Sequence, residues 1–227
     1  LPDGLHYERS AMYQQRLLWA LLILRWTNHA PIVAAIDPVI QRMLAAMLAM
    51  THPDRRITLV NDAAFGIYPG SDDLLAFAQS LGVDVQSIGR EPTGAWALPE
   101  AGYFGARTGE GHYLVCDAAP VGPSYQPGHG HADLLSLELS LFGQRVVTDA
   151  GTYDYLPTEM RRYCRGTAGH STVTVDGRNQ CELWGAFRMG RRAYPRLTDY
   201  RTTDAGFNLE AEHNGYRHLP GDRKSTR

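Results

Sequence analysis

Cysteine, net charge and long apolar runs are all scarce in this chain, and each scarcity argues against a class of protein. Three cysteines, irregularly spaced over 227 residues, are too few for a disulfide framework or a cysteine-rich zinc module. We therefore expect free thiols, with a single Cys164–Cys181 bridge as the minor alternative. A formal net charge of −2 predicts no general attraction to nucleic acid. Hydrophobic residues make up 44% and charged residues 20%, as in ordinary globular proteins.

No apolar run is long enough to predict a membrane span. The most apolar stretch, Leu17 to Leu24, is closed by Arg16 and Arg25, whereas a membrane helix needs about 20 apolar residues. We expect a buried helix there. The chain starts at Leu1 without an initiator methionine or a signal-peptide pattern and stops directly after a strand-like stretch, so we expect a fragment whose compartment its ends do not reveal.

The first third of the chain is predicted to be helical. Apolar residues recur at helical spacing over residues 17–26. A second helix is expected to use Asp37 as its N-cap and Pro38 as its first helical residue, and to stop before residue 52. A third is expected over residues 71–82, with acidic residues in its first turn. These helices resemble hairpins cut from a larger helical array.

Short β-type runs follow a change in composition near residues 90–94. We expect strands at residues 102–107, 112–118, 134–141, 145–148, 171–175 and 207–212. Successive strands without helices between them predict an antiparallel sandwich rather than a βαβ fold. The expected fold class is therefore α+β.

The residues most suggestive of chemistry are Gly128-His-Gly-His-Ala-Asp133. In an extended chain the two histidines and the aspartate would share one face, and the glycines would let a ligand approach the backbone. Asp149 and His170 follow at the ends of expected strands. Imidazole and carboxylate ligands without cysteine suit zinc with one position left open. Any one of these histidines, taken alone, would rather indicate a surface or hydrogen-bonded residue.

A second cluster is basic. Residues 161–196 contain eight arginines and only two acidic residues, with Trp184 and Phe187 among them. Arginine forks suit carboxylates and sulfates, and flat rings suit the faces of sugars. The alternative is a solvated strand face with core aromatics.

Four stretches, in this order, resemble the heparinase II/III family of polysaccharide lyases: residues 3–13 (DGLHYERSAMY), 128–133 (GHGHAD), 147–153 (VTDAGTY) and 161–177 (RRYCRGTAGHSTVTVDG). The resemblance spans about residues 1–196. It implies that residues 1–92 are the last helices of an incomplete (α/α) toroid. Residues 93–227 would be a C-terminally truncated β-sandwich domain, with the active site in the cleft between the two parts.

The resemblance also implies roles for individual residues. Tyr13 matches the catalytic tyrosine of the family and His129 its catalytic histidine. His131, Asp149 and His170 match the ligands of a structural zinc, which would brace the loop that presents His129 instead of performing the chemistry. Contacts with substrate are expected from His6, Glu8, Arg165, Trp184, Arg188 and Arg192.

The implied reaction is β-elimination across C4 and C5 of a uronate in an acidic polysaccharide. Once its carboxylate is neutralised, the uronate loses its C5 proton to a base while an acid protonates the departing O4. Tyr13 and His129 would share these roles in either order. The neutralising residue would lie upstream of Leu1, so we expect the chain alone to be inactive. The resemblance further implies the periplasm or cell envelope of a bacterium.

Two alternatives remain. A metallo-hydrolase of the β-lactamase superfamily also carries His-x-His-x-Asp, but there a further metal-binding histidine and a helix follow. Here Leu134 and a strand-like pattern follow. The second alternative is a non-catalytic protein of the same fold that binds glycans or assembles exopolysaccharide. The presence of Tyr13 and His129 favours the lyase.

Overall fold

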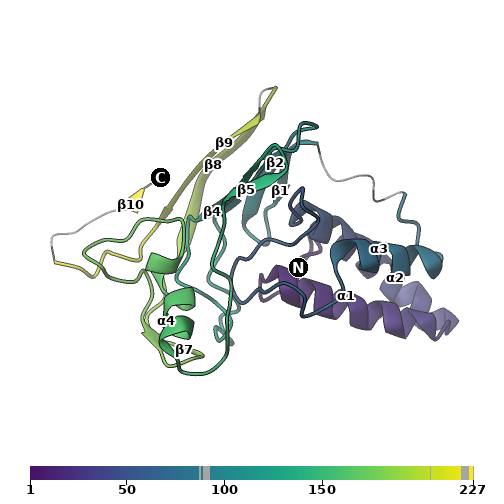
Figure 1. The fold of residues 1–227 in the computed structure, drawn as a ribbon, viewed down its shortest axis with the longest axis horizontal. Helices are drawn as coiled ribbons and strands as arrows, with labels where there is room; N and C mark the ends of the chain where they lie inside the picture. The colour runs from purple at the N-terminus through teal and green to yellow at the C-terminus, as the bar shows by residue number, and fades with distance from the viewer. Residues whose placement is uncertain (87, 89–92, 205, 221–224, 227) are drawn as a thin grey trace.

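The computed structural model describes residues 1–86, 88, 93–204, 206–220 and 225–226. Three helices come first, and strands follow with one short helix and one 3-10 turn among them (Figure 1). The helices are α1 (Ala11–Trp26), α2 (Ala30–Ala49), α3 (Ser71–Ser80) and α4 (Glu159–Arg165), and the 3-10 turn is η1 (Thr167–Gly169). The strands are β1 (Gly94–Leu98), β2 (Tyr103–Arg107), β3 (Tyr113–Asp117), β4 (Leu137–Leu141), β5 (Gln144–Val147), β6 (Leu183–Trp184), β7 (Arg188–Met189), β8 (Pro195–Thr203), β9 (Gly206–His213) and β10 (Ser225–Thr226).

The strands form antiparallel sheets, as the sequence predicts. Strands β1 to β5 make a five-stranded sheet in chain order, and β10, β9 and β8 make a second sheet. The long β8–β9 hairpin lies across from β1 and β2 (Figure 1). Phe104 of β2 packs against the ring of Tyr200 of β8, with the ring centres 4.8 Å apart. The α+β fold class with an antiparallel β-region is therefore confirmed.

Helices and sheet share one hydrophobic core. Tyr13 of α1 and Ala46 of α2 lie in the same buried cluster as Trp96, Tyr103 and Tyr113 of the sheet. This contact fixes the start of α1 against the β-region, where the site described below is built. The expected division between residues 92 and 93 stays a prediction, and residue 92 lies outside the described residues.

Helix α2 differs from its prediction. It begins at Ala30, with Pro31 in its first turn, and runs through Pro38. Asp37, the expected N-cap, instead accepts a hydrogen bond of 2.7 Å from Arg25 of α1. By length and composition α2 is apolar enough to cross a membrane, but that is weak evidence because core helices pass the same test. Ile40 is fully buried in the helical core.

Two expected strands also differ. β4 begins only at Leu137, because Leu135 adopts a left-handed conformation (φ 62°) and Ser136 closes a turn onto the Asp133 carbonyl. Among the described residues, 171–175 form no regular strand and contribute a single bridge from Val175. The three cysteines are free, as expected.

Candidate active site and metal centre

The start of α1 is fixed by its cap and by the sheet. The Ser10 hydroxyl accepts the backbone N–H of Tyr13 at 3.3 Å and donates to the carbonyl of Asp62 at 2.6 Å. Arg9, just before it, has a left-handed backbone (φ 58°), and its carbonyl accepts a 2.9 Å hydrogen bond from the Tyr103 hydroxyl. Such a conformation persists only where its surroundings impose it. The segment that carries Glu8 and Tyr13 is therefore rigidly placed.

Four side chains form a continuous hydrogen-bonded chain at this point. Glu8 Oε2 lies 2.9 Å from His129 Nδ1, and His129 Nε2 lies 3.4 Å from the Tyr13 hydroxyl. The Tyr13 hydroxyl lies 2.8 Å from that of Tyr155. The rings of Tyr13 and His129 stack with their centres 4.6 Å apart. The structure thus brings together the two residues expected to be catalytic, 116 positions apart in sequence.

The carboxylate of Glu8 can only accept a hydrogen bond, so its contact favours the His129 tautomer with the proton on Nδ1. With Glu8 accepting from Nδ1–H of His129, the Nε2 lone pair faces the Tyr13 hydroxyl. Burial raises the pKa of Tyr13, and the hydrogen bond to Tyr155 opposes this effect without cancelling it. Burial also raises the pKa of Tyr155. Both hydroxyls therefore carry their protons at neutral pH, which suits Tyr13 to donate a proton and His129 to accept one.

Tyr155 was missed by the sequence reasoning. It lies two residues past the 147–153 stretch, in a segment without regular secondary structure, and only its nearness to that stretch could have drawn attention to it. The guanidinium of Arg161 lies 5.1 Å from the centre of its ring and 5.5 Å from that of Phe187. Arg161 is itself fully buried and paired with Asp62. Tyr155 is therefore held against a fixed cation.

The residues expected to contact substrate lie in three kinds of surroundings. His6 and Glu8 lie at the catalytic chain, with the His6 ring 6.5 Å from that of Tyr13, and burial lowers the pKa of His6. Trp184 is half exposed and Arg188 is exposed. Arg165 differs from its prediction, because it is 1% exposed and donates inward to the Gly130 carbonyl. It is in no position to reach a polymer.

A second cluster of side chains includes His131, two residues after His129. Ligand atoms of His131, Asp133 and His170 all lie within 4.8 Å of one another, and all three residues are buried. Nδ1 of His131, Oδ2 of Asp133 and Nε2 of His170 have no hydrogen-bond partner among the described residues. Buried polar atoms without partners are costly, and three of them in one cluster form a group that could hold a metal ion. Two imidazoles and one carboxylate fit zinc.

The second ring nitrogen of each histidine contacts a carboxylate, as expected for histidines that bind a metal. His131 Nε2 lies 2.8 Å from Asp62, and His170 Nδ1 lies 2.7 Å from Asp149. Histidines that bind metals usually donate their other N–H to a carboxylate in this way. The structure therefore places Asp149 behind His170 and puts Asp133 among the three converging ligand atoms. The assignment of His131, Asp149 and His170 as zinc ligands stays a prediction.

The pKa of the neighbouring Asp117 carboxyl is affected by this cluster. Burial and the nearby charge of Asp133 raise the pKa of Asp117 well above its usual range. A cation bound nearby would lower this pKa, because it favours the carboxylate form.

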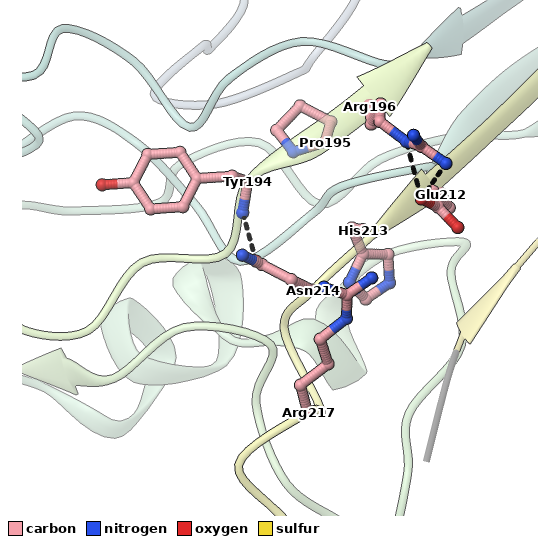
Figure 2. A pocket seen from close by; sticks show the side chains of 7 residues that line it. All are labelled: Tyr194, Pro195, Arg196, Glu212, His213, Asn214 and Arg217. Carbon is pink, nitrogen blue, oxygen red and sulfur yellow. Dashed lines mark hydrogen bonds and ion pairs between the residues drawn. The ribbon is translucent and has the colours of Figure 1, made fainter. Parts of the chain in front are cut away.

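A separate pocket of about 330 Å³ lies at the base of the β8–β9 hairpin (Figure 2). It contains an ion pair between Arg196 and Glu212, and the ring of Tyr194 points away from that pair. None of the residues expected to act in catalysis or metal binding lines it.

Comparison with known proteins gives consistent matches. A heparan sulfate lyase, a HepC mutant from Pedobacter heparinus, superposes with a TM-score of 0.74 at 20% identity, over 95% of this chain and 35% of that one. The heparinase III described as the BT4657 gene product superposes with a TM-score of 0.73 at 17% identity, over 96% of this chain and 35% of that one. The chain thus spans about a third of those structures, and at this identity the likeness shows the fold alone. No curated protein matches. The sequence model described as heparinase II/III-like, C-terminal, matches residues 90–227, more than half of the chain, and the protein belongs to that family.

Proposed function

We propose that the protein is a polysaccharide lyase that cleaves a uronate-containing acidic polysaccharide by β-elimination, in the periplasm or cell envelope of a bacterium. The observation that supports it most is the chain from Glu8 through His129 to Tyr13. A base and an acid in direct contact, each held by a further residue, are what an elimination needs at adjacent carbons.

The geometry suggests which residue takes which role. His129 Nε2 removes the C5 proton of the uronate, and the electrons of that C–H bond form the C4=C5 double bond. The C4–O4 bond breaks, and O4 takes the hydroxyl proton of Tyr13. The contact between Tyr13 and His129 then lets the imidazolium return its proton to the phenolate, which restores both residues.

The remaining residues position this pair. Glu8 orients His129 and favours the imidazolium once it forms, and Tyr155 fixes the direction of the Tyr13 hydroxyl. Zinc, when bound by His131 and His170 with a carboxylate, would brace the loop on which His129 lies. Because His129 is two residues from His131, this loop couples the two clusters.

The test is the rate of unsaturated uronate formation by the full-length protein, measured by ultraviolet absorbance. Tyr13→Phe removes one hydroxyl and almost no volume, so we expect a rate loss of about 10²–10⁴ with polysaccharide binding retained. Tyr194→Phe, at the separate pocket, is the matched control and should keep its rate. A Tyr13→Phe protein with near wild-type rate would refute the proposal. Binding without any cleavage by the wild type would favour the non-catalytic alternative.

A further inference from the structure

Two exposed tyrosines, from the segments that carry Glu8 and His129, stack on each other. The rings of Tyr7 and Tyr125 are 5.9 Å apart between centres and nearly parallel, at 14°. Their exposed fractions are 41% and 78%. They come from separate parts of the molecule, because Tyr7 lies before α1 and Tyr125 lies in the loop after β3. Neither belongs to a core cluster formed by the described residues, so core packing there does not account for the pair.

Neighbouring residues hold the Tyr7 ring and the loop that carries Tyr125. The guanidinium of Arg9 lies 5.7 Å from the centre of the Tyr7 ring and donates to the Tyr7 carbonyl at 3.3 Å. The loop of Tyr125 turns at Pro123, whose carbonyl accepts the N–H of Gln126. Arg192 donates to the same carbonyl at 3.3 Å. Prolines and these bonds restrict the loop, so little conformational freedom remains to be lost when a ligand covers the rings.

The two tyrosines are close in sequence to Glu8 and His129. Tyr7 directly precedes Glu8, and Tyr125 lies four residues before His129. The 2.9 Å contact between Glu8 and His129 holds these two segments side by side. The two tyrosines therefore belong to the same two backbone segments that carry Glu8 and His129, and a polymer bound at Tyr13 and His129 would run close to these segments.

We propose that Tyr7 and Tyr125 form a subsite for the apolar face of a sugar ring adjacent to the uronate that is cleaved. A rigid aromatic surface with hydroxyls at its edge offers C–H contacts to the ring face and hydrogen bonds to sugar hydroxyls. This inference rests on the proposed function, and it assigns Arg192 to support of the subsite loop.

The experiment measures affinity instead of turnover. The full-length protein and its variants are run by affinity electrophoresis in gels containing heparan sulfate, hyaluronan or alginate. Tyr125→Ala and Tyr7→Ala should each weaken binding of the recognised polymer by about tenfold, as loss of a buried aromatic contact does. Tyr125→Phe keeps the ring face and should bind within about twofold of wild type. Tyr194→Ala, equally an exposed tyrosine but at the separate pocket, should bind as wild type does.

The outcomes separate this subsite from the proposed reaction. Unchanged affinity of Tyr125→Ala with cleavage intact overturns the subsite and leaves the lyase standing. Weakened affinity in a protein that cleaves none of the polymers supports the subsite and contradicts the lyase. A wild type that binds none of the polymers overturns the subsite, and so does a Tyr125→Phe variant as weak as Tyr125→Ala.

Discussion

Glu8→Gln is the sharpest perturbation of the catalytic chain. The change keeps the shape of the side chain but removes the charge that faces His129 Nδ1 at 2.9 Å. Glutamine can also present its amide N–H₂ to the ring, which stabilises the tautomer with the proton on Nε2. That tautomer has no lone pair facing Tyr13, so the base is lost although every atom stays in place.

The exposure of Glu8 and His129 determines how the effect divides between stability and catalysis. Both side chains are about a quarter exposed, so their contact contributes only about 0–1 kcal/mol to stability. The loss should therefore fall on catalysis, with kcat lower by about 10²-fold, or about 2.7 kcal/mol of barrier. Binding of the polysaccharide does not need this proton, so KM should change by less than about threefold.

The assay is initial-rate kinetics on the full-length protein, with a thermal melt of the same sample. Glu110→Gln is the matched control, because Glu110 pairs with His112 at 3.3 Å on the exposed β2–β3 turn. That variant should keep both kcat and melting temperature. A Glu8→Gln protein with kcat within about threefold of wild type would refute the positioning role, since loss of a catalytic orienter is far larger.

Three further predictions concern the metal, the loop and the interior. His131→Ala should lose bound zinc in elemental analysis, and its melting temperature should be about 5–10 °C lower. Asp133→Asn should also lose the metal. A wild type without metal, or a His131→Ala protein with an unchanged melting temperature, would contradict this prediction. Gly130→Ala places a methyl group against the Val121 carbonyl, so urea melts should show about 1–3 kcal/mol of destabilisation, and an unchanged midpoint would count against the loop geometry. Burial lowers the pKa of His52 below 6.5, so the folded state resists its protonation and the free energy of unfolding should fall as the pH drops below 6.5, by at most about 1.4 kcal/mol per pH unit. His52→Gln should remove that part of the pH dependence, and an identical pH profile in the variant would show that another group is responsible.

Periodicity predicted the elements better than it predicted their environment. Leucines alternate with polar residues over residues 134–141, but in β4 the structure buries Glu138 and Ser140 and leaves the leucines partly exposed. Glu138 is satisfied there because it accepts the N–H of Leu59 at 2.6 Å and pairs with Arg145 at 2.9 Å. Periodicity alone gives the spacing of two faces, and only the partners of each face decide which one is buried.

Sequence motifs predicted which residues form the site, but they did not predict the turns that set the directions of the side chains. Tyr13 and His129 came from the family resemblance, and the fold joins them. The extended-chain assumption behind the GHGHAD motif failed for His129, because the turn closed by Gly130 N–H onto the Pro127 carbonyl separates it from His131. His131 and Asp133 do lie together, in the buried cluster with His170. A left-handed Leu135 carries no sequence signal of the kind that glycine gives.

The most direct test of the central claim is the mass of the products formed by the full-length protein from a defined uronate oligosaccharide. Elimination adds no water, so the two fragments together should weigh what the substrate weighed, and the fragment with the new non-reducing end should carry a C4=C5 double bond. Tyr13→Phe and His129→Ala should form neither fragment at a comparable rate. Fragments heavier in sum by one water would show hydrolysis and contradict the account.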